Sequence, residues 1–439
     1  MTYVATKQRK ERRGRLWGAA FIVAFFTMNL PLIPSLGGEY QPIFMLLLGL
    51  AAVYSAQSIP KTVFFTAVAI VAALLFAAIN SLLHGSFDAM ALLRCSVGIF
   101  FLVSARDIFL RVPIAAFTVI IWTHGFFAVI GIVNPQIAVN FIDFLGLRGA
   151  QSYEGWNAFL ASEPSYAALN LAAVLVLRTL KLHTEDTESK NKTVYLVGVL
   201  ILFITKSATG AILGVILLMA LVTSGRKWAA VWLLGGTVTF GCLVIFAQQS
   251  GFISEYLGHR VAALLDVMVL TVKDASVISF FILDPSAGSR IVQNMTGFLV
   301  PFYYPIGVGN FDLGNLAQEV SPAMVSIINA SDELGLKFRA GVPAASLGVF
   351  GGIIPLVIML VISYWGFRNV FSANGLDLKL FVMVFLVTGI VWQGALTAPG
   401  WWLVLGFSMT LKSISVRCSK DEPHRLVRMT NGYLSHGIP

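Results

Sequence analysis

The sequence predicts an all-α integral membrane protein, with a polytopic bundle of about 12 transmembrane helices and a large helical loop on one side of the membrane. Two features of composition and one of pattern support this prediction. Hydrophobic residues make up 57% of the chain and charged residues only 12%, whereas a soluble domain carries about 25% charged residues. The apolar residues form long runs, and the basic residues fall in short clusters between those runs.

The positions of the helices follow from the thickness of the bilayer. A hydrocarbon core of about 30 Å requires roughly 20 apolar residues in helical conformation. This criterion predicts spans at residues 16–33, 42–59, 62–82, 89–105, 114–133, 163–180, 193–206, 208–223, 228–247, 347–366, 378–396 and 399–414. The first run has full span length and no small-x-small cleavage site, so we interpret it as an anchor rather than a removed leader.

Lysines and arginines orient the spans, because these residues are enriched in the cytoplasmic loops of membrane proteins. One side holds the basic N-terminus, Lys61, Arg106, Arg111, residues 178–192, Arg226, Lys227, Arg368, Lys379 and the tail from Lys412. The other side holds Arg148, Lys206, Arg260, Lys273, Arg290, Lys337 and Arg339. We therefore expect both termini in the cytoplasm. Arg94 alone lies within a span and is left unassigned.

Residues 193–223 are too many for one ordinary span at about 1.5 Å per residue and few for two. Lys192 before this segment and Arg226 after it should face the same compartment. The segment is therefore predicted to be a hairpin of two short helices with its tip near residues 206–210.

The predicted organisation places two long loops on the external side. Residues 1–247 would form the first nine helices with an external loop at 134–162, followed by a large external loop at 248–345, the last helices at 346–414 and a cytoplasmic tail at 415–439. Loops of this length are more often functional than mere connectors. Within the large loop, Glu255–Lys273 reads as an amphipathic helix, and a second short helix is expected after Asp284-Pro285-Ser286.

Several classes of chemistry are disfavoured. The sequence contains no P-loop, dinucleotide fingerprint, HExxH or GxSxG motif, so nothing suggests nucleotide energy, a cofactor or a metal. Cys95, Cys242 and Cys418 form no CxxC pair, which argues against a disulfide or a metal site. The net charge of +9 is not gathered on one amphipathic face, so we predict no nucleic-acid partner.

The external side instead offers sparse cations beside small-residue turns. They are Arg148 in LGLRGAQS, Lys206 in ITKSATG, Arg290 in SAGSRIVQN, and Lys337 with Arg339 in GLKFRAG. Such groups suit a pyrophosphate, because guanidinium groups bind phosphate oxygens in bidentate fashion. Glu163 is a candidate carboxylate where the external loop enters a helix at Pro164, although a carboxylate there also suits a helix cap. An external arginine is, in most proteins, a solvated or lipid-headgroup contact.

Residues 148–355 resemble the bacterial O-antigen polymerase and ligase superfamily, the Wzy-type and WaaL-type enzymes. The matching features, in order, are an external arginine, the Ser-Glu-Pro-Ser helix entry at 162–165, the serine-containing hairpin at 206–210, an arginine followed by Tyr-Pro-Ile-Gly-Val-Gly-Asn-Phe at 304–311, and residues 346–352 opening the next span. Gly307 and Gly309 are interpreted as turn residues rather than as a phosphate cradle.

The resemblance implies a metal-independent glycosyltransferase of the bacterial inner membrane. Such an enzyme moves a growing glycan from undecaprenyl pyrophosphate onto another lipid-linked repeat unit, yielding O-antigen or exopolysaccharide. Its implied partners are lipid-linked oligosaccharides, membrane lipids, a chain-length regulator and a flippase. We assign catalysis to Arg290 and Lys206 at the donor pyrophosphate and to Glu163 as base, with substrate-binding candidates at Arg148, Arg339, Ser207, Ser289 and Lys337.

Two departures from the family pattern bear on this assignment. Lysine stands at 206, where an arginine beside the serine is more usual. In the ligase branch a histidine precedes the span after the long loop, and residues 337–343 contain none, which favours polymerase over ligase. The alternatives are a ligase, a flippase or transporter, and a non-catalytic scaffold. A transporter should show an internal repeat and charges near the midplane.

Overall fold

The computed structural model describes residues 2–28, 30, 41–56, 59–144, 161, 164–185, 192–224, 285–311, 313–320, 341–391 and 398–412. Every regular element in these ranges is a helix, which confirms the all-α prediction for this part of the chain. The predicted span at 228–247 and the predicted amphipathic helix at 255–273 lie outside the described residues.

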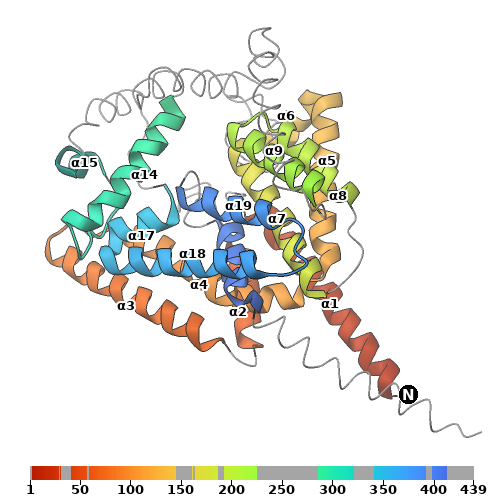
Figure 1. Ribbon diagram of the computed structural model, residues 1–439, viewed down its shortest axis with the longest axis horizontal. Coiled ribbons are helices and arrows are strands. Elements are labelled where there is room, and N and C mark those ends of the chain that lie inside the picture. The colour runs from red at the N-terminus through yellow and green to blue at the C-terminus, as the bar shows by residue number, and fades with distance from the viewer. Residues whose placement is uncertain are drawn as a thin grey trace, which may run out of the picture.

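The helices lie close to the predicted runs (Figure 1). They are α1 (Thr2–Thr27), α2 (Ile43–Tyr54), α3 (Lys61–Leu83), α4 (Ala89–Arg111), α5 (Ile114–Val133), α6 (Pro135–Phe144), α7 (Pro164–Glu185), α8 (Lys192–Ile204), α9 (Ala208–Thr223), α14 (Pro285–Tyr303), α15 (Gly314–Val320), α17 (Pro343–Gly351), α18 (Ile353–Ser372) and α19 (Lys379–Val391), followed by a helix at 399–412. The predicted helix starts at Pro164 and after Asp284 are confirmed, although α14 is longer than expected.

Of the described helices, 5 are long and apolar enough to cross a membrane, namely α3, α4, α5, α7 and α18. Shorter apolar helices are α2, α8, α9 and α19. The structure therefore supports a membrane protein, whereas the count of about 12 spans stays a prediction. α1 also differs from expectation, because it continues through the basic N-terminal segment.

The predicted span at 347–366 is wrong as a single helix. The structure divides it at Gly352 into α17 and α18, and Gly352 has a φ of 83° that L side chains rarely adopt. Residues 304–311, which we call the glycine turn, pack against this break. The amide of Val308 donates to Val349 O (2.9 Å), that of Gly309 to Phe350 O (3.1 Å), and that of Ile353 to Pro305 O (2.9 Å).

These bonds explain how an interrupted helix is stabilised in an apolar surrounding. Backbone groups freed by a break must find partners where water is scarce, and the glycine turn supplies them. A Cβ on Gly352 would overlap the carbonyl oxygen of Pro305, and a Cβ on Gly307 would overlap that of Phe350. The two glycines are therefore required for the close approach of the backbones, and the interpretation of Gly307 as a turn residue is confirmed.

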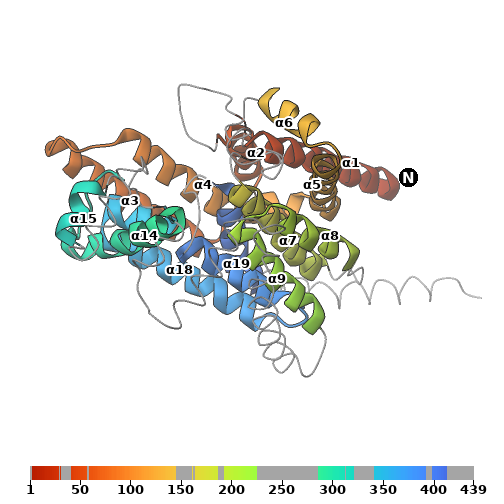
Figure 2. The same cartoon turned by 90° about the horizontal axis from the view of Figure 1, so that it is seen from above.

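The helices pack around α7, in whose apolar stretch 89% of the residues are buried. α7 contacts α5, α8, α9 and α19. A second, smaller apolar cluster joins α14, α15 and α17 through Val292, Val300, Leu313, Ala317, Val320, Val342, Ala345 and Val349. This cluster holds α14 and α15 on the opposite side of the molecule from α1 and the N-terminus in both views (Figures 1 and 2).

The chain reverses at short turns, so the helices have two distinct ends. The basic end comprises the C-terminal ends of α2, α4, α7, α18 and the helix at 399–412, and the N-terminal ends of α3, α5, α8 and α19. The distal end comprises the opposite ends of these helices together with α9's start, α14, α15, α17 and the glycine turn. The described cations at the basic end are Lys61, Arg106, Arg111, Arg178, Lys181, Lys192, Arg368, Lys379 and Lys412. The distal end holds Lys206 and Arg290, in agreement with the predicted charge segregation, and also Arg94, which was predicted within a span and lies in the second turn of α4.

Candidate functional site

Three of the predicted site residues, Lys206, Ser207 and Arg290, are described with their side chains. Ser289 lies in α14, and only its backbone is described. Four others, Arg148, Glu163, Lys337 and Arg339, lie outside the described residues. The described part of the predicted site therefore consists of the α8–α9 hairpin tip and the N-terminal half of α14.

The hairpin predicted around Lys206 is confirmed. α8 ends at Ile204, α9 begins at Ala208, and the two helices pack together. Lys206 has a φ of 49° and donates its amide to Phe203 O at 3.0 Å. This left-handed position after a helix is normally filled by glycine, and a bulkier residue there costs roughly 1–3 kcal/mol. A half-buried lysine held in an unfavourable backbone conformation is a reason to suspect function.

Ser207, next to this lysine, fixes the start of α9. Its side-chain oxygen accepts a hydrogen bond from the amide of Gly210 at 2.9 Å and lies 3.1 Å from Thr205 Oγ1. Thr205 Oγ1 in turn donates to Leu202 O at 2.7 Å. Ser207 is buried. This network shows Ser207 acting as the N-cap of α9, a role that positions Lys206, whereas its predicted contact with substrate stays a prediction.

Arg290 lies on the polar face of α14. It is half-buried, and Gln293 and Asn294, one helical turn further along, are buried. The side-chain amide of Asn294 donates to the carbonyl of Val391, the last residue of α19, at 3.1 Å. The apolar residues Val292 and Val300 belong to the second cluster. The polar face that carries Arg290 is thereby attached to the distal end of α19.

Buried polar side chains gather at the distal end. They come from α7 (Ser165, Asn170), α9 (Thr209), α14 (Gln293, Asn294, Thr296) and α17 (Ser346). α19 packs against α7, α9 and α17, and Asn294 ties α14 to it. Buried polar groups also lie towards the basic end, among them Asp107, Arg178 and Lys181. The distal set differs in that the α8–α9 hairpin and α14 also carry the half-buried cations Lys206 and Arg290.

Sequence reasoning missed some of these residues. Asn170 interrupts the apolar run AALNLAAV, which could have identified it. Gln293 and Asn294 stand three and four positions after Arg290, a spacing that places them on the same helical face. Thr209 lies inside the predicted hairpin tip but gives no signal beyond its position.

The glycine turn attaches α14 to the remainder of the distal end. The amide of Asp88, which caps α4, donates to Gly309 O at 3.0 Å, and the side chain of Asn310 donates to Ser86 O at 3.2 Å. Together with the bonds to α17 and α18, these contacts fix the C-terminal end of α14. The segment at 304–311 therefore has a positioning role in the structure.

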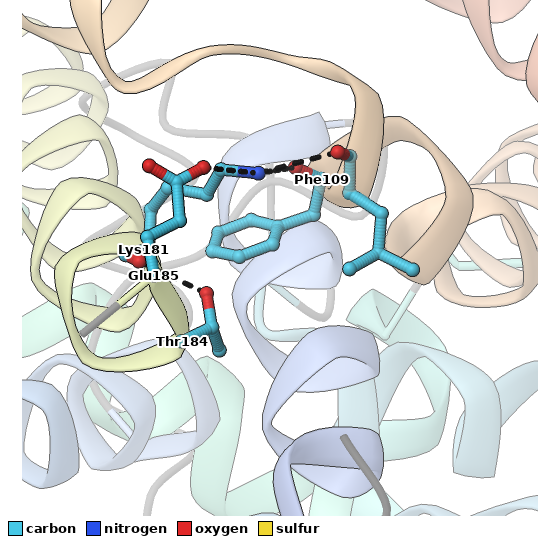
Figure 3. Close-up of polar contacts among 5 residues, drawn as sticks. Phe109, Lys181, Thr184 and Glu185 are labelled. Carbon is cyan, nitrogen blue, oxygen red and sulfur yellow. Dashed lines mark hydrogen bonds and ion pairs between the residues drawn. The ribbon is translucent and has the colours of Figure 1, made fainter. Parts of the chain in front are cut away.

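Cations at the basic end have a different environment. The ammonium group of Lys181 donates to Phe109 O (2.9 Å) and Leu110 O (3.3 Å) at the end of α4 and pairs with Glu185 (3.1 Å), as Figure 3 shows. It also lies 5.2 Å from the centre of the Phe109 ring. Three partners match the three N–H donors of lysine. Lys181 therefore joins α7 to the C-terminal end of α4, where a cation is favoured by the helix dipole.

Arg178, one turn before Lys181, is also used in packing. Its Nε donates to Thr118 Oγ1 of α5 at 3.2 Å, and its guanidinium lies 4.9 Å from the centre of the Tyr195 ring of α8. Both cations are 4% exposed. The basic end consequently uses its buried charges to hold helices together.

Within the described ranges, no group of three or more His, Cys, Asp or Glu side chains lies close enough to hold a metal ion. The buried polar groups of the distal end are amides and hydroxyls. Beside them stand the half-buried cations Arg94, Lys206 and Arg290, and such a set suits a polyhydroxylated anion. Comparisons with protein-family models, with curated proteins and with solved structures found no match for this chain.

Proposed function

We propose that this protein is a polysaccharide polymerase of the bacterial inner membrane, a metal-independent glycosyltransferase that makes O-antigen or exopolysaccharide at the periplasmic face. The observation that carries the proposal is the presence of half-buried cations, Lys206 and Arg290, beside buried polar side chains on the α8–α9 hairpin and on α14, at the end of the helices opposite most of the described basic residues. The resemblance of residues 148–355 to the O-antigen polymerase and ligase superfamily supplies the reaction.

The proposed reaction transfers the growing glycan from undecaprenyl pyrophosphate to a sugar hydroxyl of a lipid-linked repeat unit. The bond between the anomeric carbon and the pyrophosphate oxygen breaks, and a bond from that carbon to the acceptor oxygen forms. The acceptor hydroxyl gives its proton to a base, for which Glu163 is the candidate. Undecaprenyl pyrophosphate leaves with the electron pair, and fixed cations stabilise its developing charge.

Arg290 and Lys206 would divide this stabilisation. A guanidinium group presents two parallel donors to phosphate oxygens, whereas an ammonium group acts as a point charge. Lys206 stands at a hairpin tip, and Arg290 stands in the second turn of α14. A site at the ends of apolar helices lies at the level of lipid headgroups, where the pyrophosphate of a membrane-bound carrier also lies.

The packing of α7 favours this proposal over a flippase. A lipid-linked oligosaccharide moving across the membrane needs a polar path near the midplane. The centre of the described bundle is instead occupied by α7, which is packed on by α5, α8, α9 and α19. The first two turns of α7 carry the buried polar residues Ser165 and Asn170.

Glycan length in cells tests the proposal. Arg290→Ala, produced at normal protein level in a strain lacking the wild-type copy, should abolish polymer while single-repeat glycan persists. Arg290→Lys should restore some polymer, and Arg368→Ala, a matched change of an exposed cation at the basic end, should leave chain lengths unchanged. Wild-type chain lengths with Arg290→Ala would contradict the assignment. Loss of all glycan in the deletion strain would indicate a ligase or flippase.

A further inference from the structure

A tyrosine and a carboxylate are paired on the surface of the distal end, outside the cation site. Tyr304 directly follows α14, and its hydroxyl donates to Glu319 Oε2 of α15 at 2.5 Å. Glu319 is exposed and Tyr304 is half-buried. The other carboxylate described nearby, Asp88, is already used to cap the start of α4. Glu319 is therefore a carboxylate open to a ligand.

The segments that carry Tyr304 and Glu319 are held in place by packing and by main-chain hydrogen bonds. Ala317 and Val320 of α15 are buried in the second apolar cluster with Val300 of α14, and Tyr304 packs against the same cluster. The glycine turn that begins at Tyr304 is attached to α17 and α18 through main-chain hydrogen bonds. The geometry of the pair is thus set before any ligand binds, which lowers the entropy cost of binding.

The chemistry of the pair selects a ligand with hydroxyl groups. Because the tyrosine proton is donated to Glu319, the pair offers acceptors only, namely the second carboxylate oxygen and the phenol lone pair. Glu319 Oε1 accepts no hydrogen bond from any residue that the structure describes. The negative charge would repel a phosphate, whereas sugar hydroxyls can donate to both oxygens. The phenol is protonated at neutral pH, and the hydrogen bond to Glu319 raises the pKa of Tyr304 further.

Distance separates this pair from the cation site. At 1.5 Å per residue, Arg290 lies about 20 Å along α14 from the end of the helix at Tyr303. The backbone of Tyr304 therefore stands about 20 Å along the helix axis from that of Arg290, which places the phenol away from the bond that joins the sugar to the pyrophosphate. Several linked sugar rings span such a distance. We propose that Tyr304 and Glu319 form a subsite that binds sugar hydroxyls of the lipid-linked oligosaccharide, several rings from its pyrophosphate.

This inference rests on the proposed function, and substrate length provides a test that separates the two. The full-length protein is reconstituted in lipid vesicles and given one of two acceptors on the same lipid pyrophosphate. One acceptor carries the complete repeat unit isolated from the parent strain, and the other carries only its first sugar. The wild type should form polymer and should show a lower KM for the complete unit than for the truncated one.

Glu319→Gln should raise KM for the complete unit by about tenfold, leave KM for the truncated unit unchanged, and leave kcat unchanged for both. Tyr304→Phe should act in the same direction with a smaller change, because the carboxylate remains. Asp143→Asn is the matched control, since it removes an exposed carboxylate from α6 and should change neither acceptor. Unfolding temperatures of the variants show whether each is folded.

Three results would overturn the inference. KM values unchanged by both Glu319→Gln and Tyr304→Phe would show that the pair does not touch the glycan. An equal loss with both acceptors would show a structural role, as would unfolding of both variants. Absence of polymer with the wild type would overturn the proposed function and this inference together. Polymer formation by the wild type, with KM values in both variants equal to those of the wild type, would overturn the subsite alone.

Discussion

The basic end and the distal end both carry charged side chains near helix ends, but the side chains differ in how deeply they are buried. At the basic end, Lys181 and Arg178 are almost fully buried, and their partners are carbonyls, a hydroxyl, a carboxylate and aromatic rings of neighbouring helices. At the distal end, Lys206 and Arg290 are both half-buried. Lys206 lies on a strained turn, and Arg290 lies near the start of the amphipathic helix α14. A cation buried among neighbouring helices stabilises the fold, whereas a half-buried cation also presents part of its surface to solvent.

The largest expected effect concerns the break that supports the distal end. Gly352→Ala would place a Cβ on the Pro305 carbonyl at a positive φ, and should destabilise the protein by about 3 kcal/mol while releasing the glycine turn. Gly85→Ala is the matched control, because Gly85 has a φ of 69° but open space around it. Thermal unfolding in detergent measures both. Equal effects would mean that backbone strain alone, without the contact between the turn and the break, explains the result.

Lys181→Ala tests the structural role of the basic end. The change leaves the carbonyls of Phe109 and Leu110 without their donor and should lower the free energy of unfolding by about 2 kcal/mol. Lys192→Ala, at the exposed start of α8, should have little effect. Glycan chain length per molecule of folded protein should stay as in the wild type. A change in chain length at equal amounts of folded protein would show that Lys181 affects function as well as stability, and would contradict a purely structural role for the basic end.

Much of this architecture could be predicted because apolar length and charge placement act over whole segments. The hairpin at Lys206 followed from the lysines and arginines on either side of it, and the start of α7 followed from Pro164. The break at Gly352 did not, because its apolar neighbours resemble those of a continuous span, and the partners that satisfy it lie some forty positions earlier in the chain. The pairing of Tyr304 with Glu319 is likewise a tertiary contact that no local pattern reveals.

A smaller effect is expected at the hairpin tip. Ser207→Ala removes the N-cap of α9 and should cost about 1 kcal/mol, whereas Ser207→Thr keeps a hydroxyl and should cost less. Because this cap fixes the turn that holds Lys206, polymer length should fall with Ala and recover with Thr. Gel profiles of the glycan and unfolding curves provide the two readouts. Equal glycan profiles for Ser207→Ala and the wild type would show that the N-cap of α9 is not needed for the function of Lys206.

The smallest effect is a pH dependence at the surface pair. The hydrogen bond to Glu319 raises the pKa of Tyr304 above its ordinary value of 10.0. The folded state therefore holds this proton more tightly than the unfolded state, so the stabilisation is complete below pH 10.0 and is lost as pH rises through the raised pKa. Hydrogen exchange at α15 should accelerate in that range. Tyr304→Phe should remove the pH-dependent step, and a step that persists would assign it to another group.

The most direct test of the distal end as the reaction site is the rate of polymer formation by purified protein in vesicles supplied only with lipid-linked repeat units. We predict that Arg290→Ala lowers this rate by about 100-fold or more, because a fixed cation at the leaving pyrophosphate is lost. Arg368→Ala, which removes an exposed cation at the basic end, should retain the wild-type rate. An Arg290→Ala protein that forms polymer as fast as the wild type would contradict the account.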